Sequence, residues 1–185
     1  MMQQNFIPAV NLRNKDILVQ IPADRPGYYK WWAPKTVLDS IFEKLGLTTS
    51  QVDEFQKYIE TRDNYYCIYV GIAANDSIRD RLDTHVNQYK AERNIRRSTL
   101  RKSLTSLFAQ NKQDIVTTNK IIDLLRIEYF AVDLPIKSQE AINKIEGVEN
   151  DLLSCEYLYV LNIQKNRHPL AQITIPRLKT LRKMD

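Results

Sequence analysis

The chain has 185 residues, of which 43% are hydrophobic and 26% are charged. These proportions are typical of one soluble globular domain, and we expect a single domain over residues 1–185. No apolar run reaches the roughly 20 residues that a membrane-spanning helix needs, so we do not expect a membrane protein. The first residues lack the pattern of a signal peptide, and Cys67 and Cys155 lie in apolar runs that favour buried free thiols. We therefore expect a cytoplasmic protein.

Basic residues are in modest excess, 27 Lys and Arg against 22 Asp and Glu, which gives a formal net charge of +5. They gather in two places. The first is a cluster after the middle of the chain, and the second is a basic C-terminal tail at about residues 165–185. Such clusters can follow a phosphate backbone, and the alternative is a solvated basic face. Their members are Arg93, Arg96, Arg97, Arg101 and Lys102 in the first, and Arg177, Lys179, Arg182 and Lys183 in the second.

The first third of the chain alternates between strand and helix patterns. We expect a short strand at about residues 16–21 and an aromatic strand at 27–33, entered through Pro26-Gly27 and closed by Pro34. Residues 34–62 then show helical periodicity in two apolar stripes that Gly46 separates. The sequence therefore predicts a pair of helices inserted between two aromatic strands.

The stretch from Tyr66 to His85 contains the next strand and helix. Residues 66–73 are rich in β-branched and aromatic side chains, which predicts a buried strand whose dense part ends at Gly71. Asn75-Asp76-Ser77 can cap the following helix, whose apolar stripe is Ile78, Leu82, Val86 and Tyr89. Arg81 and His85 are four residues apart on this helix and therefore neighbours. An Arg and a His near a strand that presents Tyr69 suit chemistry on an anion.

The second half of the chain predicts a helix from Ser98, a short helix at 119–125, a strand at 126–133 and a helix from Ser138 to about 154, followed by irregular chain. The helix from Ser138 places Glu149 on the same side as Ile145, Leu152 and Leu153. A buried carboxylate needs a cation, a metal or hydrogen-bond donors, and a divalent cation is a reasonable partner. The alternative is a partly exposed structural glutamate. Glu156 extends the same stripe and is the second candidate.

Taken together, these segments resemble the motifs of the GIY-YIG nuclease family. Gly27-Tyr28-Tyr29 is similar to the first motif, with Tyr28 in place of the usual aliphatic residue, and Tyr69-Val70-Gly71 is similar to the second. The family's Arg-Leu-x-x-His pattern matches residues 81–85. Glu149 before Leu152-Leu153 resembles the metal-binding glutamate, and Asn162 resembles a late asparagine of the family. The resemblance covers about residues 27–168.

The resemblance implies an α+β fold with a small three-stranded antiparallel sheet flanked by helices. Here a helical insertion at about 34–62 separates the first two strands, which a short hairpin usually joins in the family. Ile72 stands where some relatives carry a lysine.

The implied function is a metal-dependent endonuclease of restriction or repair type that hydrolyses phosphodiester bonds in DNA, with Mg²⁺ or Mn²⁺ held by Glu149. Arg81 would stabilise negative charge in the transition state, and Tyr69 or Tyr29 would orient or deprotonate the attacking water. His85 would move a proton or position the phosphate. The expected DNA contacts are Arg96, Arg97, Arg101, Lys102 and Asn162.

Several alternatives stay open at this point. RNA could replace DNA as the substrate, and cutting both strands with one small site would call for a homodimer. Tyr29 and Tyr69 could be core aromatics, in a chain with 10 tyrosines. Trp31 and Trp32 could stack on bases, although at least one of them is expected in the core. The rival functions are a non-catalytic nucleic-acid-binding protein on the same fold and a protein-interaction module built on residues 34–62.

Overall fold

A five-stranded antiparallel sheet forms the centre of the protein, with the strand order β1-β5-β2-β4-β3. The computed structural model describes residues 6–95, 97–154 and 156–183. The α+β class is confirmed, but the expectation of a three-stranded sheet is wrong. The strands are β1 (Phe6–Pro8), β2 (Gly27–Pro34), β3 (Thr61–Arg62), β4 (Tyr65–Ala73) and β5 (Arg126–Ala131).

The two additional strands, β1 and β3, are short, and each lies at one edge of the predicted three-stranded sheet. β1 pairs with β5 over three residues, too few to show an alternating pattern. β3 pairs with the start of β4 through a hairpin whose turn residues, Asp63 and Asn64, have φ of 48° and 64°. Two successive positive φ values are typical of the tight turn that joins twisted strands. Asp63 and Asn64 thus form the turn just after the predicted helical segment 34–62, and β3 replaces the last two residues of that segment.

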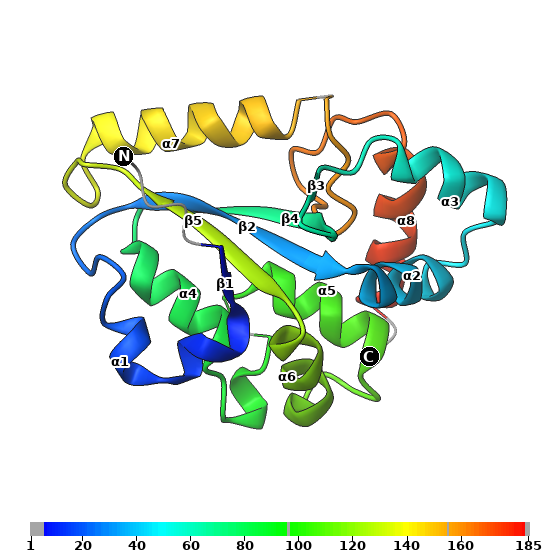
Figure 1. Ribbon diagram of the computed structural model, residues 1–185, viewed down its shortest axis with the longest axis horizontal. Coiled ribbons are helices and arrows are strands. Elements are labelled where there is room, and N and C mark those ends of the chain that lie inside the picture. Colours follow the sequence, from blue (N-terminus) through cyan, green and yellow to red (C-terminus); the bar gives the residue numbers. More distant parts are fainter. Residues whose placement is uncertain (1–5, 96, 155, 184–185) are drawn as a thin grey trace.

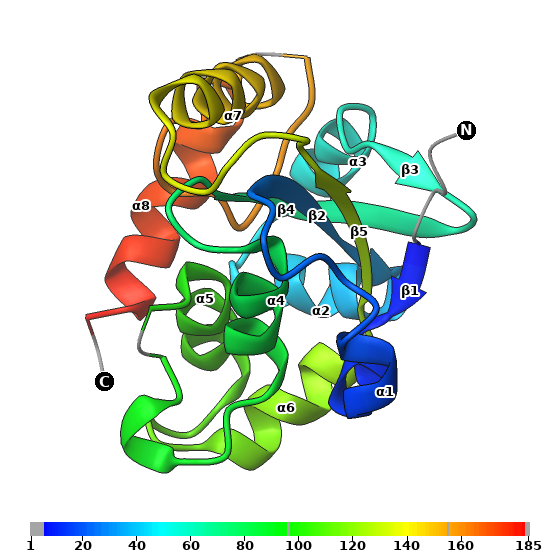
Figure 2. The same cartoon turned by 90° about the vertical axis from the view of Figure 1, so that its left-hand side faces the viewer.

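Helices cover both faces of the sheet (Figure 1). Helix α7 lies along one face, and α4, α5 and α6 cover the other. In Figure 2, α8 lies beside α5. The helices are η1 (Ala9–Arg13), α1 (Lys15–Leu18), α2 (Lys35–Lys44), α3 (Thr49–Gln56), α4 (Ile78–Val86), η2 (Ala91–Arg93), α5 (Thr99–Phe108), α6 (Ile115–Asp123), α7 (Gln139–Leu152) and α8 (Ala171–Leu181). In the described part of the chain, no helix has the length and apolar character needed to cross a membrane.

The predicted helical insertion at 34–62 contains the helices α2 and α3, but it ends earlier than predicted, because α3 stops at Gln56 and residues 61–62 form β3. Gly46 follows α2 with a φ of 64°, a conformation that suits glycine after a helix. Thr48 and Gln51 then form a capping box at the start of α3. Phe42 and Phe55 pack edge to face between the two helices, with ring centroids 6.0 Å apart. The insertion thus has its own apolar seam beside the sheet.

Two segments differ from their predicted structure. Residues 16–21 are not a strand, because Asn14 caps the short helix α1 by accepting a hydrogen bond from the Asp16 N–H. The C-terminal tail is not a free basic segment: it contains α8, which buries Ala171, Thr174 and Leu178. Pro176 inside α8 obscured the helical pattern, although proline removes only one intrahelical donor.

The aromatic strand β2 is buried on both of its faces. Trp31 and Trp32 are 0% and 1% exposed, so neither can stack on a base in this structure. Cys67 is a buried free thiol as predicted, whereas Cys155 lies outside the described residues. Tyr89 is wrongly predicted as part of the apolar stripe of α4, because the helix ends at Val86 and the Tyr89 side chain is exposed.

Candidate active site

The antiparallel pairing of β2 with β4 brings the two motif tyrosines together. Tyr29 pairs with Gly71, and Trp31 pairs with Tyr69. The side chain of Tyr29 lies directly over Gly71, where an added Cβ would overlap the phenol ring and its hydroxyl group. Gly71 is therefore required by this close approach, and both tyrosine side chains are buried.

Helix α4 supplies a histidine to the hydroxyl group of Tyr29. The Tyr29 hydroxyl oxygen and His85 Nε2 are 2.7 Å apart, and His85 Nδ1 is 2.7 Å from Ser98 Oγ. His85 is fully buried, and burial together with the charges of Arg81 and Arg101 holds its pKa well below the usual range. The imidazole is thus neutral, with both ring nitrogens bonded to protein hydroxyls. In this arrangement His85 positions Tyr29 and has no free nitrogen for a phosphate.

Arg81 is held beside the same tyrosine. Its Nε donates to the Tyr29 hydroxyl oxygen over 3.2 Å, and its Nη1 donates to the Arg97 carbonyl over 2.8 Å. The side chain remains partly exposed. A guanidinium fixed at two points and open on another side can bind phosphate oxygens with little loss of conformational freedom.

Tyr69 faces a small cavity together with Glu149. The cavity has a volume of about 110 Å³, which is room for about three water molecules. Thr99 Oγ1 lies 2.5 Å from the Tyr69 hydroxyl oxygen. Burial raises the pKa of Tyr69, while the Thr99 hydrogen bond and the charge of Arg81 act in the opposite direction. The cavity is lined by Tyr69, Thr99, Glu149, Leu161, Asn162, Ile163, Gln164 and Arg182.

Glu149 is the carboxylate that this cavity contains. Its side chain is 14% exposed and lies 2.8 Å from Lys165 Nζ, on a lysine side chain that is 45% exposed. Glu156 is exposed and lies beyond the end of α7, so it does not extend the stripe as predicted. Of the two candidates, the geometry favours Glu149.

Glu149 would be the carboxylate ligand of a divalent metal in this cavity. Among the described residues, no group of three or more His, Cys, Asp or Glu side chains could hold a metal ion. Mg²⁺ commonly keeps several waters and binds through one or two carboxylates together with substrate phosphates. A single carboxylate in a polar cavity fits that manner of binding, and Lys165 is exposed enough to move aside.

Two of the predicted DNA contacts have structural roles instead. Arg101 is fully buried, and its guanidinium donates to the carbonyls of Asn94 and His85 over 2.6 and 2.9 Å, and to the side chains of Asn94 and Asn119. Burial, followed by the charge of Arg13, lowers its pKa to about 10. The prediction for Arg101 is wrong because net charge in a sequence does not reveal which cation satisfies buried carbonyls.

Asn162 is the second. Its Oδ1 accepts from the Val70 N–H over 2.9 Å and its Nδ2 donates to the Val70 carbonyl over 2.8 Å. The side chain therefore takes the place of a neighbouring strand along β4 and holds the strand that carries Tyr69. Of the other predicted contacts, Arg97 is exposed, Lys102 is partly exposed, and Arg96 lies outside the described residues.

The start of α5 contributes more to the site than the sequence indicates. Three successive residues contact three site side chains: the Arg97 carbonyl contacts Arg81, Ser98 contacts His85, and Thr99 contacts Tyr69. Arg182, from the end of α8, donates to the Thr99 carbonyl over 3.0 Å and lines the cavity. From the sequence, Ser98 indicates the start of a helix. That pattern does not reveal the contact between Ser98 and His85.

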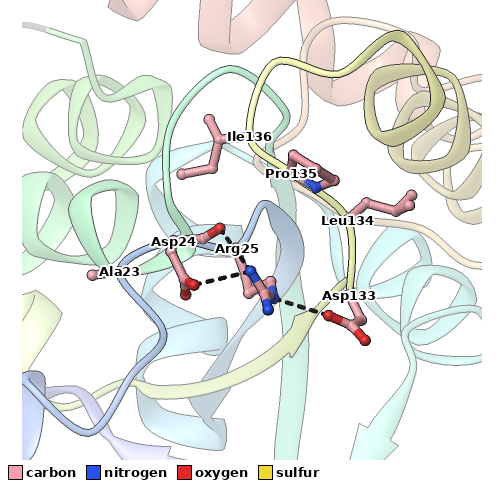
Figure 3. A pocket seen from close by; sticks show the side chains of 7 residues that line it. All are labelled: Ala23, Asp24, Arg25, Asp133, Leu134, Pro135 and Ile136. Atoms are coloured by element: carbon pink, nitrogen blue, oxygen red, sulfur yellow. Dashed lines mark hydrogen bonds and ion pairs between the residues drawn. The ribbon is translucent and has the colours of Figure 1, made fainter.

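A wider depression of about 560 Å³ lies elsewhere and contains none of these residues. Figure 3 shows its lining, in which Arg25 is paired with Asp24 over 2.9 Å and with Asp133 over 3.0 Å. Its only arginine is thus neutralised by carboxylates, and the depression has neither tyrosine nor glutamate. It is lined by Ala23, Asp24, Arg25, Asp133, Leu134, Pro135 and Ile136.

Comparison with protein families gives one match. The model of the GIY-YIG catalytic domain matches residues 27–184, which is most of the chain. The chain belongs to the GIY-YIG family. No curated protein and no solved structure matches it.

Membership of the GIY-YIG family places the chain among nucleases, whose substrate is nucleic acid and which generally use divalent metals. The matched residues continue beyond 168, where the motif resemblance ends, and include α8. Arg182, which lines the cavity, therefore belongs to the GIY-YIG domain.

Proposed function

We propose that this GIY-YIG protein is a metal-dependent endonuclease that hydrolyses phosphodiester bonds in DNA. The observation that carries the proposal is the cavity that Tyr69 and Glu149 share beside Arg81. The charge of Arg81 acts on the pKa of both Tyr69 and Tyr29, and so does the charge of Glu149. Arg81 contacts Tyr29 directly, and Glu149 shares a cavity with Tyr69, and this arrangement supports a phosphate and a water bound at one site.

Arg81 binds the phosphate and stabilises the negative charge that grows on it in the transition state. Its two hydrogen bonds, to Tyr29 and to the Arg97 carbonyl, fix the guanidinium before the substrate arrives. Because the guanidinium is already fixed, the site does not have to reorganise when the negative charge develops.

Tyr69 is the better placed of the two tyrosines to act on the attacking water. It lines the cavity, whereas the hydroxyl of Tyr29 is bonded to His85 and Arg81. Because the pKa of Tyr69 is raised by burial, its hydroxyl is protonated at neutral pH, and it would orient the water unless a nearby cation lowers that pKa. A divalent metal held by Glu149 would supply Lewis-acid activation of the phosphate.

Tyr29, His85 and Ser98 form the support of this centre. The chain of two 2.7 Å hydrogen bonds keeps the Tyr29 hydroxyl at a fixed position against Arg81. These residues act through Arg81, without contacting the substrate.

The test is a cleavage assay with supercoiled plasmid, single-stranded DNA and RNA, in Mg²⁺, in Mn²⁺ and in EDTA. We expect DNA to be cut only when a metal is present. Salt-dependent binding with no cutting under any condition would favour the non-catalytic nucleic-acid-binding protein. Cutting that EDTA does not reduce would contradict the metal dependence, and faster cutting of RNA would replace DNA as the substrate.

A further inference from the structure

A second polar depression lies next to Arg81 and takes no part in the chemistry described above. It has a volume of about 360 Å³ and is lined by Thr84, Gln88, Arg93 and Arg97. Thr84 comes from α4, Gln88 lies two residues beyond the end of that helix, Arg93 ends η2, and Arg97 lies just before α5. Figure 2 shows α4 and α5 next to each other, with the connection between them looping out beyond the two helices.

Most arginines of this protein are engaged in holding the fold together. Arg13 is paired with Asp123 over 2.7 Å, Arg177 donates to the Leu45 carbonyl over 2.7 Å, and Arg101 is fully buried. Arg93 and Arg97 differ, because both are exposed and their guanidinium groups make no hydrogen bond or ion pair with the described residues. Two positive charges therefore face this depression without a structural function.

No carboxylate of the described residues lines the depression. Asp83 and Glu92 are the nearest acids in sequence, and neither belongs to the lining. The carboxylate of Asp83 accepts a hydrogen bond from Asn87 Nδ2 over 2.8 Å. The two guanidinium groups are the main donors of this site, because the Thr84 hydroxyl donates to the Asp80 carbonyl over 2.8 Å and Gln88 Nε2 donates to the Thr84 carbonyl over 3.3 Å. A pair of guanidinium groups suits a phosphate.

The depression is joined to the catalytic centre through Arg97. The carbonyl of Arg97 accepts from Arg81 Nη1, and Thr84 lies one turn after Arg81 on α4. Arg97 has a φ of 62°, a left-handed conformation that costs free energy in a residue with a side chain. In this conformation the carbonyl of Arg97 fixes Arg81, and the side chain of Arg97 lines the depression.

We propose that Thr84, Gln88, Arg93 and Arg97 form a subsite for the backbone phosphate next to the scissile phosphate. The proposal rests on the proposed nuclease function. Among the described residues, no aromatic side chain on which a base could stack lines the depression, so the ligand is the phosphodiester backbone and not a base. Arg81 then binds the scissile phosphate, and the four residues hold the same strand one step away.

The test combines protein variants with substrates in which one phosphate is made neutral. Each oligonucleotide carries a single methylphosphonate, placed at successive positions around the cleavage site. Binding is measured with two proteins: Glu149→Gln alone, and Glu149→Gln combined with Arg93→Ala and Arg97→Ala. The matched control carries Lys15→Ala and Lys44→Ala, two exposed lysines away from the depression.

We expect the arginine variant to bind about tenfold more weakly and with a salt slope lower by about 1 to 2. For the Glu149→Gln protein that keeps both arginines, a methylphosphonate next to the scissile position should weaken binding about tenfold. For the variant that lacks both arginines, the same methylphosphonate should not weaken binding further. Equal losses for both proteins at every position would overturn the subsite, even if the wild-type protein cuts DNA. Absence of nucleic-acid binding by every protein, with no cutting by wild type, would overturn the proposed nuclease function as well.

Discussion

The hydroxyl oxygen of Tyr29 and Nε2 of His85 are 2.7 Å apart, although 56 positions separate the two residues. Tyr29 reaches this position because it crosses Gly71 on the neighbouring strand, and His85 reaches it from the helix that follows that strand. The first and second tyrosine motifs and the Arg-Leu-x-x-His helix are thereby joined in one buried contact. This contact orients the hydroxyl group on which Arg81 is fixed.

Gly71→Ala should disrupt this contact directly. The added methyl group overlaps the Tyr29 ring, which is fully buried and has no space to move. We expect a loss of about 1–3 kcal/mol in the free energy of unfolding and a large fall in kcat. The control is Gly147→Ala in α7, where the new Cβ meets nothing within 4 Å and should stabilise the helix by about 0.5–1 kcal/mol. Urea denaturation and cleavage rates measure both effects, and an unchanged rate for Gly71→Ala would argue against the role of Tyr29.

Ser98→Ala separates the cap of α5 from the support of His85. Ser98 caps α5 through the Arg101 N–H and also bonds His85 Nδ1. Ser138 caps α7 in the same way and has no such second contact among the described residues. Ser138→Ala should cost about 1 kcal/mol of stability, and Ser98→Ala should cost more because it also leaves the buried His85 Nδ1 without its partner. Only Ser98→Ala should lower kcat, by about 10- to 100-fold. Equal kcat values for the two variants would mean that Ser98 is a cap alone.

The sequence predicted the residues of the centre better than their partners. The motif resemblance named Tyr29, Tyr69, Arg81 and Glu149, and in the structure Tyr29 contacts Arg81 while Tyr69 and Glu149 line one cavity. Their catalytic roles stay predictions. The roles of Arg101 and Asn162 could not be predicted. Both satisfy backbone groups that become unpaired only once the chain has folded, and side-chain type alone does not reveal such a requirement.

The two sheet edges were missed for a related reason. A strand of two or three residues has too few side chains to show alternation, so β1 and β3 are defined by pairing with β5 and β4. The helix α8 was missed because Pro176 and the basic side chains indicate an unstructured tail, while its burial of Leu178 depends on contacts with distant elements.

Lowering the pH should destabilise the protein through His85. Its pKa in the folded state is depressed by burial, so below about pH 6.5 the unfolded state binds a proton that the folded state does not. Stability therefore falls as the pH decreases from about 6.5, by about 1.4 kcal/mol per pH unit for each such proton. Urea denaturation at pH 7, 6 and 5 measures this slope.

His85→Gln should make that slope shallower. His168 is the other histidine, and burial lowers its pKa too, so His168→Gln serves as the comparison and should retain the contribution of His85. If His85→Gln keeps the full pH dependence of the wild-type protein, the buried neutral imidazole is not its source.

Lys165→Ala should strengthen the binding of a divalent metal at Glu149. The lysine ammonium lies 2.8 Å from the carboxylate and must give way to the metal, but its side chain is half exposed, so the pair contributes only about 0–1 kcal/mol. We therefore expect a gain of up to about fivefold in affinity for Mn²⁺, measured by electron paramagnetic resonance. Lys144→Ala, an exposed lysine on the same helix as Glu149, should leave the affinity unchanged. Weaker Mn²⁺ binding by Lys165→Ala would show that the lysine supports the carboxylate.

The measurement that tests the central claim most directly is DNA cleavage by Glu149→Gln beside Glu156→Gln, in Mg²⁺ and in Mn²⁺. Glu149 lines the cavity of Tyr69, whereas Glu156 is exposed beyond the end of α7. We predict that Glu149→Gln binds DNA but loses at least about 100-fold in kcat, and that Glu156→Gln cuts at the wild-type rate. Wild-type cleavage by Glu149→Gln, or loss of cleavage in Glu156→Gln with its fold intact, would contradict the assignment of this site.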